Sequence, residues 1–547
     1  MQPIVDIRPD HLRLVRDILR QHVPLAEVWA FGSRAKWLAR DTSDLDLCIR
    51  DAASLSFEQM GLLREAFEES NLPYKVDVVD WATISASFRK VVERDKVVIQ
   101  KGSVAGEWEE SVLGELIEAG DAHLQTGPFG TALKAAEYSA EGVPLISVGE
   151  VRQGYFEVSD KTPRVSEETT KRLPKFILEI GDIVFGRKGG IDRNAFVHPQ
   201  QRGWFLGSDG IRLRLSEKFS SLFFSYQMRS PATRTWLLQN CEGTTMPSLN
   251  QQILGRVPIV IPPLSEQKTI AHILGTLDDK IELNRRMNAT LEAMARTLFQ
   301  SWFVDFDPVR AKLDGRQPAG LDAATAALFP SHFQDSPLGP IPQGWEVGSI
   351  LRQADLLSGG TPKTDVSAYW DGNILWASAK DVSQCGEAFL VSTERTITKL
   401  GVGKSSTKII PALVTVIVAR GATTGRLTMF GESMAMNQTC YGLKSKVDAP
   451  YSLYCHARYF IDRLVQGGHG SIFDTITTST FDATDVLLAP DDVLQAFNRQ
   501  VTPLFKQILA NIHQSRTLAA LRDALLPKLL SGEISITDTE NLVEVVS

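Results

Sequence analysis

This chain of 547 residues lacks several marks of secreted, membrane and zinc-binding proteins. Its five cysteines are scattered and form no Cys-x-x-Cys pair, which excludes a disulfide framework and a zinc site of ordinary spacing. No apolar run approaches the roughly 20 residues that a membrane-spanning helix needs. The N-terminal stretch is charged and amphipathic and has no apolar core of the kind found in a secretory signal. We therefore expect a cytoplasmic protein without membrane contact.

Positive charge is also scarce, with 58 Lys and Arg against 65 Asp and Glu and a net charge of −7. A field of that sign repels phosphate, so any contact with nucleic acid has to be local. Two catalytic signatures are missing as well. The chain has no Gly-x-x-x-x-Gly-Lys-Ser/Thr phosphate loop and no Gly-rich methyl-donor loop with Asn-Pro-Pro-Tyr, so we expect neither a motor nor a methyltransferase in it.

What the chain does have is an internal repeat. Residues 263–298 and 490–525 carry the same pattern of large apolar residues at a constant offset of 227. Asn284 matches Asn511 at the same offset, and each stretch opens on a proline. Such a match indicates a duplicated structural unit. The matched apolar residues are Leu274, Leu277, Ile281, Leu291, Met294 and Leu298 in the first stretch, and Val501, Leu504, Ile508, Leu518, Leu521 and Leu525 in the second.

The apolar spacings of three and four predict two long helices, each with one apolar stripe. A helix of about 40 residues is on the order of 60 Å long, and its stripe is stable only when covered. We therefore expect the two helices to pair as an antiparallel coiled coil. The alternative is a pair of unrelated core helices, and the shared register argues against it.

The segments before each helix also resemble each other, although their offset drifts by several residues. GDIVFGRKGG at residues 181–190 and VTVIVARGATTG at 414–425 both read as a buried strand that ends in a basic, glycine-containing turn. Each segment has many short predicted strands and turns, which favours an α+β domain of roughly 150 residues. The expected order is globular domain, long helix, globular domain, long helix.

Over about residues 105–535 the sequence resembles the specificity subunits of type I restriction–modification systems. The motifs LQTGPFGTALK, LLSGGTPKT, SLNQQILGRVPIVIPPLSEQ and LRDALLPKLLSGEI carry the resemblance. It implies two target-recognition domains that each read one half of a split site in double-stranded DNA. The two helices would hold the domains apart and dock two methyltransferase subunits. Restriction and translocase subunits would complete the complex, and the specificity body would need no cofactor.

Sequence reading requires side chains at base edges, while phosphate contacts set the register on the duplex. Basic residues in the glycine-rich turns are the candidates for both kinds of contact. For each of them the alternative is an ordinary solvated surface charge. The candidates are Arg187, Lys188 and Arg193 in the first domain, and Lys363, Lys380, Arg420 and Arg426 in the second.

The first hundred residues carry a different signal. Gly32 and Ser33 follow an apolar predicted strand, and Asp44 and Asp46 come ten residues later at the next one. Asp77 lies in KVDVVD, which alternates like a strand. Because side chains alternate along a strand, Asp44 and Asp46 face the same side. Such converging carboxylates favour divalent cations, and oxygen ligands suit Mg²⁺.

This pattern resembles the minimal nucleotidyltransferase family over about residues 1–100. The resemblance implies that Gly32 and Ser33 bind the phosphates of a nucleoside triphosphate, with Arg34 as a further contact. Asp44, Asp46 and Asp77 would hold Mg²⁺, and Asp77 would also activate the acceptor hydroxyl. The ions would neutralise charge on the phosphates. An inactive binding or antitoxin-like module, or carboxylates that merely cap a hairpin, are the alternatives.

Together these observations predict an α+β multidomain protein with an α/β nucleotidyltransferase-like domain ahead of a pseudo-twofold repeat. The leading hypothesis is a DNA-recognition subunit with an appended domain. The alternative is a nucleotidyltransferase, acting on protein or nucleic acid, that a DNA-binding body directs to its target. The expected segments are the nucleotidyltransferase-like domain at 1–103, recognition domain 1 at 104–262, the central helix and connector at 263–336, recognition domain 2 at 337–489, and the C-terminal helix and tail at 490–547.

Overall fold

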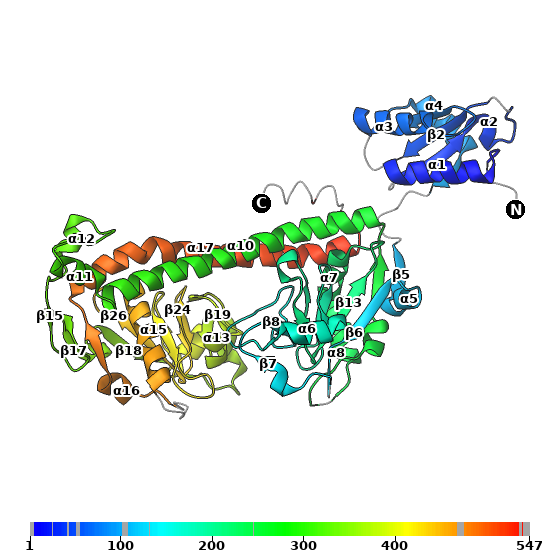
Figure 1. Cartoon of the computed structure of the whole chain (residues 1–547). Helices are drawn as coiled ribbons and strands as arrows, with labels where there is room; N and C mark the ends of the chain where they lie inside the picture. Colours follow the sequence, from blue (N-terminus) through cyan, green and yellow to red (C-terminus); the bar gives the residue numbers. More distant parts are fainter. Residues whose placement is uncertain are drawn as a thin grey trace. The chain divides into compact units, whose positions relative to one another are not determined.

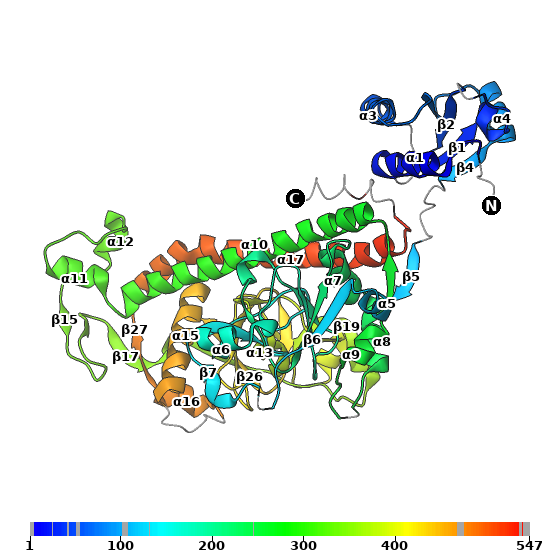
Figure 2. The ribbon, with the colours of Figure 1, turned by 45° about the vertical axis from the view of Figure 1, so that its right-hand side comes forward.

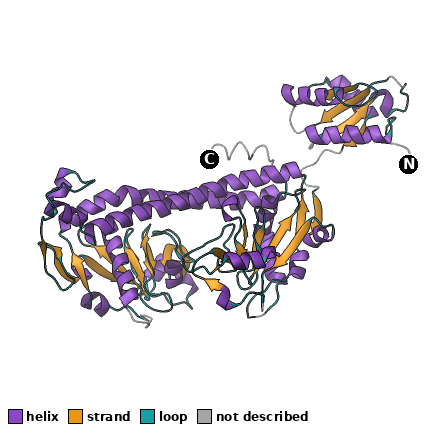
Figure 3. Cartoon of the chain, viewed as in Figure 1, coloured by secondary structure: helices purple, strands orange, loops and turns teal. Residues whose placement is uncertain are grey.

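A computed structural model of the chain describes residues 5–23, 26–40, 43–50, 55–100, 108–130, 132–243, 245–467, 475–534 and 539. The expected junction between Gly102 and Gly106 lies outside them. Helices and strands are interspersed along the chain (Figures 1 and 3). The chain forms two compact units, one of Met1–Gly275 with Asp523–Val546 and one of Thr276–Arg522. In the described part of the chain, no helix is both long and apolar enough to cross a membrane.

The N-terminal domain is built on a four-stranded sheet in the order β3-β2-β1-β4. Strand β2 runs antiparallel to β1 and parallel to β3. Apolar side chains of α1 and α3 pack on one face of the sheet, while Val92 of α4 packs against Trp29 and Phe31 on the other. The strands are β1 (Glu27–Phe31), β2 (Leu45–Arg50), β3 (Val76–Asp80) and β4 (Val97–Gln100), and the helices are α1 (Pro9–His22), α2 (Gly32–Ala35), α3 (Phe57–Glu68) and α4 (Ala86–Asp95).

The first globular domain contains one sheet in the order β11-β10-β13-β6, a second in the order β12-β8-β9-β7, and the pair β14-β5. Its core lies between buried strand residues such as Ile146, Val184 and Phe205. The strands are β5 (Glu109–Val112), β6 (Ala122–Thr126), β7 (Tyr138–Ser139), β8 (Val143–Ile146), β9 (Arg164–Val165), β10 (Ile183–Gly186), β11 (Asn194–Phe196), β12 (Phe205–Leu206), β13 (Gly210–Leu215) and β14 (Pro258–Ile261). The helices are α5 (Leu113–Glu118), α6 (Glu167–Arg172), α7 (Ser221–Arg229), α8 (Pro231–Asn240) and α9 (Gln251–Gly255).

The second globular domain contains sheets in the orders β18-β26-β23-β24-β20 and β21-β19-β25-β22, and the pair β17-β27. The strands are β17 (Glu346–Ser349), β18 (Ala354–Ser358), β19 (Trp370–Ala377), β20 (Phe389–Leu390), β21 (Arg395–Ile397), β22 (Ile409–Ile410), β23 (Thr415–Val418), β24 (Leu427–Phe430), β25 (Met434–Met436), β26 (Cys440–Ser445) and β27 (Asp485–Leu488). The helices are α13 (Ala379–Gln384), α14 (Lys399–Gly403), α15 (Pro450–Gly467) and α16 (Thr478–Ala483). The connector before this domain holds α11 (Asp307–Leu313), α12 (Ala323–Ala327), β15 (Phe333–Gln334) and β16 (Ile341–Pro342).

Corresponding strands of the two globular domains pair in the same order. The series β11-β10-β13-β6 matches β24-β23-β26-β18, with every neighbour antiparallel. The parallel pair β8–β12 matches β19–β25, and the pair β5–β14 matches β17–β27. The duplication inferred from the long helices therefore extends through both domains.

Helices α10 (Leu264–Phe303) and α17 (Asp491–Leu530) each contain 40 residues. They lie side by side in both views of the ribbon (Figures 1 and 2). Within the second unit, Arg522 pairs with Asp278, while Phe497 meets Phe303. Residues further along α10 therefore contact residues that lie closer to the N-terminus of α17. This confirms the predicted antiparallel pairing.

Buried asparagines occupy the middle of the helix pair. Asn284 donates to Ser515 over 3.2 Å and to Gln514 over 2.9 Å, and Asn511 donates to Asn288 over 2.9 Å. Under the repeat offset of 227, the contact between Asn284 and Ser515 becomes the contact between Asn511 and Asn288. The pseudo-twofold axis of the helix pair therefore passes through this hydrogen-bond network.

The predicted apolar stripe is largely buried, but one of its members lies outside it. Leu277, Val501 and Ile508 are fully or almost fully buried. Met294 is instead 49% exposed, and its neighbour Ala295 takes the buried position. Ala295 belongs to the buried cluster that also contains Phe505. The stripe was therefore predicted correctly in register and wrongly at Met294.

The asparagine network gives a first prediction, for the variant Asn511→Ala. It removes the donor to Asn288 and leaves buried polar groups unpaired, which costs about 1–3 kcal/mol in the free energy of unfolding. We expect a lower thermal midpoint for the unit that contains the helix pair, measured by differential scanning calorimetry. Arg499→Ala, at an exposed position on the same helix, is the control. Equal midpoints for both variants would contradict a stabilising role for the network.

Candidate functional site

The carboxylate cluster of the N-terminal domain forms where β1 ends and α2 begins. Gly32 has a φ of +78°, and a Cβ atom there would lie 2.2 Å from Oδ2 of Asp46. Only glycine suits that backbone conformation and that close approach. The Gly-Ser motif therefore brings the chain directly against the carboxylate of β2.

Asp46 and Asp77 are register partners in the parallel pair of β2 and β3. Burial raises the pKa of Asp46, and the neighbouring carboxylates of Asp77 and Asp44 raise it further. Lys75 forms an ion pair with Asp77, with both side chains largely exposed. The predicted cluster thus gathers negative charge at one edge of the sheet. A cation bound there would lower the electrostatic free energy of the carboxylates.

The chemistry of these oxygen donors fits a hard divalent cation. Within the described ranges, no three His, Cys, Asp or Glu side chains are arranged to hold a metal ion. Asp46 and Asp77 are the adjacent pair, whereas exposed Asp44 lies just before β2 and not on the strand as expected. The ion pair between Lys75 and Asp77 would have to break before Asp44, Asp46 and Asp77 could bind the same cations.

Arg34 makes contacts within the N-terminal domain. Its guanidinium donates to the carbonyl oxygens of Ser43 and Asp6 over 2.7–2.9 Å and stacks on the ring of Tyr74 at 3.9 Å. The side chain is buried. These contacts give Arg34 a structural use, tying α2 to the segment before β2, and leave the expected phosphate contact without support.

In the first globular domain, the candidate basic residues flank the hairpin of β10 and β11. Lys188 forms a bridge with Ser248, and Gly186 donates to the carbonyl of Arg193 over 3.2 Å. Arg187 donates to the carbonyl of Ser208 over 3.4 Å. Lys188 and Arg193 are exposed, whereas Arg187 is half-buried.

The second globular domain repeats this arrangement. Arg420 forms a bridge with Thr475, and Val418 donates to the carbonyl of Arg426 over 2.8 Å. Lys188 is therefore the structural counterpart of Arg420, and Arg193 that of Arg426. All four side chains are exposed, so each domain has a basic residue at both ends of the same hairpin tip.

The other two candidates have no such counterpart. Lys380 lies at the start of α13 and pairs with Glu394 over 2.7 Å. Lys363 is exposed in the loop after β18, and its carbonyl accepts from Trp370 over 3.0 Å.

Sequence reasoning also missed Phe129, which is 66% exposed with its ring 5.9 Å from the Arg187 guanidinium. Its position between the glycines of GPFG was the available signal.

Helix α10 carries exposed apolar side chains besides its buried stripe. Leu283, Met287 and Met294 are all exposed, at spacings of four and seven. Residues at these spacings share one helix face. Exposed apolar side chains that gather on one face mark surfaces for protein partners. We call these three residues the outer stripe.

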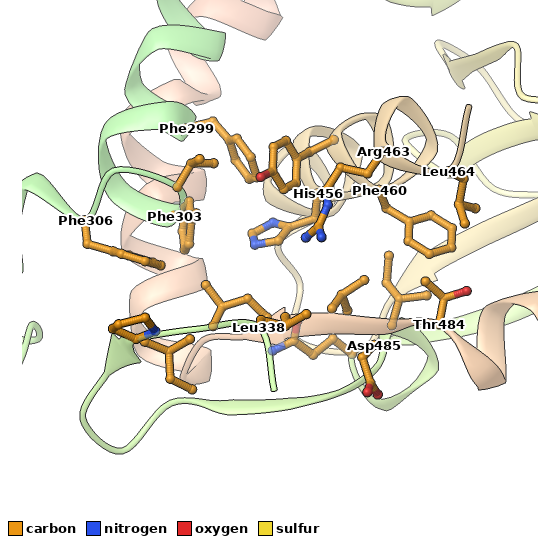
Figure 4. Close-up of a pocket in the computed structure, with 18 residues that line it drawn as sticks. Phe299, Phe303, Phe306, Leu338, His456, Phe460, Arg463, Leu464, Thr484 and Asp485 are labelled. Atoms are coloured by element: carbon orange, nitrogen blue, oxygen red, sulfur yellow. The ribbon is translucent and has the colours of Figure 1, made fainter. Parts of the chain in front are cut away.

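A cavity of about 300 Å³ lies in the second unit, between the end of α10, α15 and β27. Figure 4 shows Phe299, Phe303 and His456 around it, with Arg463 beside them. Burial lowers the pKa of His456 to about 4, and its Nδ1 lies 2.9 Å from the carbonyl of Ser452. His456 is therefore neutral and donates through Nδ1. The mostly apolar walls do not suit a DNA backbone.

Comparison with known proteins gives two family matches. The model of the type I restriction modification DNA specificity domain matches residues 105–293 and 342–495. The model of the polymerase beta nucleotidyltransferase matches residues 14–103.

Three curated relatives follow the same division. The HindI specificity subunit of Haemophilus influenzae is 27% identical over 347 residues, covering 54% of this chain and 73% of the relative. The MjaIX specificity subunit of Methanocaldococcus jannaschii is 23% identical over 458 residues, covering 80% and 96%. The probable protein adenylyltransferase MntA of Haemophilus influenzae is 48% identical over 97 residues, covering 18% and 85%.

The raised pKa of Asp46 gives a second prediction. A folded-state pKa above the usual value means that ionised Asp46 destabilises the domain at neutral pH, and that this cost disappears as the pH falls. Without divalent cations at neutral pH, Asp46→Asn should therefore slow hydrogen exchange in β2 and β3. Mg²⁺ should slow exchange in the unmodified chain and leave the variant unchanged. Glu93→Gln is the control, because the Glu93 side chain is exposed on α4. If Mg²⁺ still slows hydrogen exchange in the Asp46→Asn variant, the proposed cation site is wrong.

Proposed function

Since the chain belongs to the type I restriction modification DNA specificity family, we propose that it reads a split DNA site through its two globular domains. Each domain would read one half of the site. The observation that carries the proposal is the repeated hairpin, with Lys188 and Arg193 in one domain and Arg420 and Arg426 in the other. Paired basic residues at equivalent positions suit two similar contacts with a duplex.

These four residues would supply local positive charge on a chain with a net charge of −7. Phosphate contacts from them would position each domain, while neighbouring side chains would read base edges. Arg187, Lys363 and Lys380 remain candidates for such contacts. The acidic balance of the whole chain suits a subunit that binds DNA tightly only together with its partners. Its place of work would be the cytoplasm.

The helix pair would set the distance between the two half-sites and dock the partner subunits. The outer stripe of Leu283, Met287 and Met294 is an apolar surface on a rigid helix. A helix of a methyltransferase subunit could cover it with the usual spacing of three and four residues. The pseudo-twofold relation of the two helices suits two methyltransferase copies, and restriction subunits would join through them.

For the N-terminal domain we propose transfer of a nucleotide from a nucleoside triphosphate to an acceptor hydroxyl. Gly32 and Ser33 would approach the phosphates, and Asp44, Asp46 and Asp77 would hold the magnesium ions. Bound magnesium would neutralise charge on the phosphates. Asp77 would accept the proton of the hydroxyl, whose oxygen forms a bond to the α-phosphorus while pyrophosphate leaves. The 48% identity to a probable protein adenylyltransferase supports this proposal and favours a protein acceptor.

A third prediction concerns DNA binding. The double variant Lys188→Ala with Arg193→Ala should weaken binding of the assembled complex to its site. Two lost phosphate contacts should also reduce the slope of log K against log salt by about 2. Fluorescence anisotropy at several salt concentrations measures both effects. Lys171→Ala, exposed on α6 of the same domain, is the control, and an unchanged slope in the double variant would contradict the assignment.

Methylation mapping tests the proposed function as a whole. A host that expresses the chain with its methyltransferase partners should acquire methylated adenines in one split motif. Asp44→Asn with Asp46→Asn should leave that motif unchanged, because the carboxylates serve the other activity, and should abolish transfer of labelled nucleotide. A genome without a split motif would contradict the recognition function. Unaltered nucleotide transfer in the double variant would contradict the proposed site.

A further inference from the structure

Apolar side chains are exposed immediately after the Gly-Ser turn of the N-terminal domain. Leu38 is 75% exposed, and its backbone N–H donates to the carbonyl of Ser33 over 3.0 Å. Trp37 is exposed as well and has a φ of +58°, which is unusual and costly for a bulky residue. The chain therefore exposes two large apolar groups at the end of the turn that begins with Gly32 and Ser33.

Helix α4 brings two more exposed apolar residues to the same region. The ring of Phe88 meets Phe31, the residue before Gly32, with 5.7 Å between the ring centroids. Val91 lies three positions further along the helix and is exposed. Lys36 of the turn after α2 pairs with Asp95 at the end of α4 over 2.6 Å. Trp37, Leu38, Phe88 and Val91 thus belong to two linked elements, and we call them the apolar patch.

Charge around the patch does not suit nucleic acid. Residues 1–100 contain 14 Lys and Arg against 16 Asp and Glu, which gives no net attraction for phosphate. Several nearby basic groups are engaged, whereas the side chains of Lys90 on α4 and Arg40 after the turn are exposed. Lys36 and Arg94 pair with Asp95, Lys75 pairs with Asp77, and Arg89 donates to the backbone carbonyls of Trp81 and Ala82. Exposed apolar groups in a domain without net positive charge fit a protein surface.

We propose that the apolar patch docks the protein that receives the nucleotide and presents its hydroxyl to Asp46 and Asp77. The inference rests on the nucleotide transfer proposed above and adds the surface that selects the acceptor. The acceptor would be a folded protein with a serine, threonine or tyrosine hydroxyl set among apolar side chains. In-line transfer needs the hydroxyl held close to the α-phosphorus, and a surface contiguous with the Gly-Ser turn supplies that positioning.

The test uses the full chain with two lysine substitutions, Leu38→Lys and Val91→Lys. Both positions are exposed, so the fold tolerates the charge, while an apolar partner surface does not. Phe57→Lys is the matched control, because Phe57 is 96% exposed and begins α3, which packs on the opposite face of the sheet. Each protein is incubated with radiolabelled ATP, Mg²⁺ and an extract of its host, with and without nucleases. ATP binding by the purified chain is measured in parallel by calorimetry.

We expect the unmodified chain and Phe57→Lys to label the same nuclease-resistant protein bands. The double lysine variant should label those bands at least tenfold less while binding ATP as before, because the patch positions the acceptor and does not hold the nucleotide. Full labelling by the double variant would overturn the docking surface and leave nucleotide transfer standing. Nuclease-sensitive labelling would overturn a protein acceptor. An unmodified chain that labels nothing would overturn the proposed transfer itself, and this inference with it.

Discussion

The repeated body of the chain depends on covering the apolar stripes of two helices that are each 40 residues long. A helix of that length with one apolar face is not stable alone in water, so α10 and α17 stabilise each other. Their aromatic end, around Phe303 and Phe497, also packs against α15 of the second globular domain. The same contact therefore holds the rod together and fixes a recognition domain on it.

The N-terminal domain follows a different constraint. Its sheet brings Asp46 beside Asp77, and burial raises the pKa of Asp46 in a way that costs stability at neutral pH. If these residues only had to form a stable hairpin, replacing the carboxylates with neutral side chains would raise the free energy of unfolding. Cation and nucleotide binding would account for this cost, and Gly32 lets the chain approach Asp46 closely enough to serve them. The N-terminal domain and the repeated body would thus carry separate functions, one of transfer and one of recognition.

Much of this could be predicted from the sequence. Helix periodicity gave the register of the repeat, because a stripe that must be buried repeats at a fixed spacing. Alternation along KVDVVD predicted the strand that carries Asp77, and the family resemblance implied that Asp77 joins Asp46, its register partner in the structure. Other features depend on three-dimensional packing. Arg34 could point toward a ligand or into the core, and only the position of Tyr74 decides. The equivalence of Arg193 and Arg426 was hidden by loop lengths that shift the repeat offset, and Met294 lost its buried position to Ala295.

The central claim is that the helix pair sets the distance between two DNA half-sites. The most direct measurement inserts one heptad into both α10 and α17, midway along each, and maps the methylated motif by sequencing. Seven residues add about 10.5 Å of helix, which equals about 3 base pairs of duplex. The account predicts that both half-sites keep their sequences while the spacer between them grows by about 3 base pairs. An unchanged spacer in an active complex would contradict it.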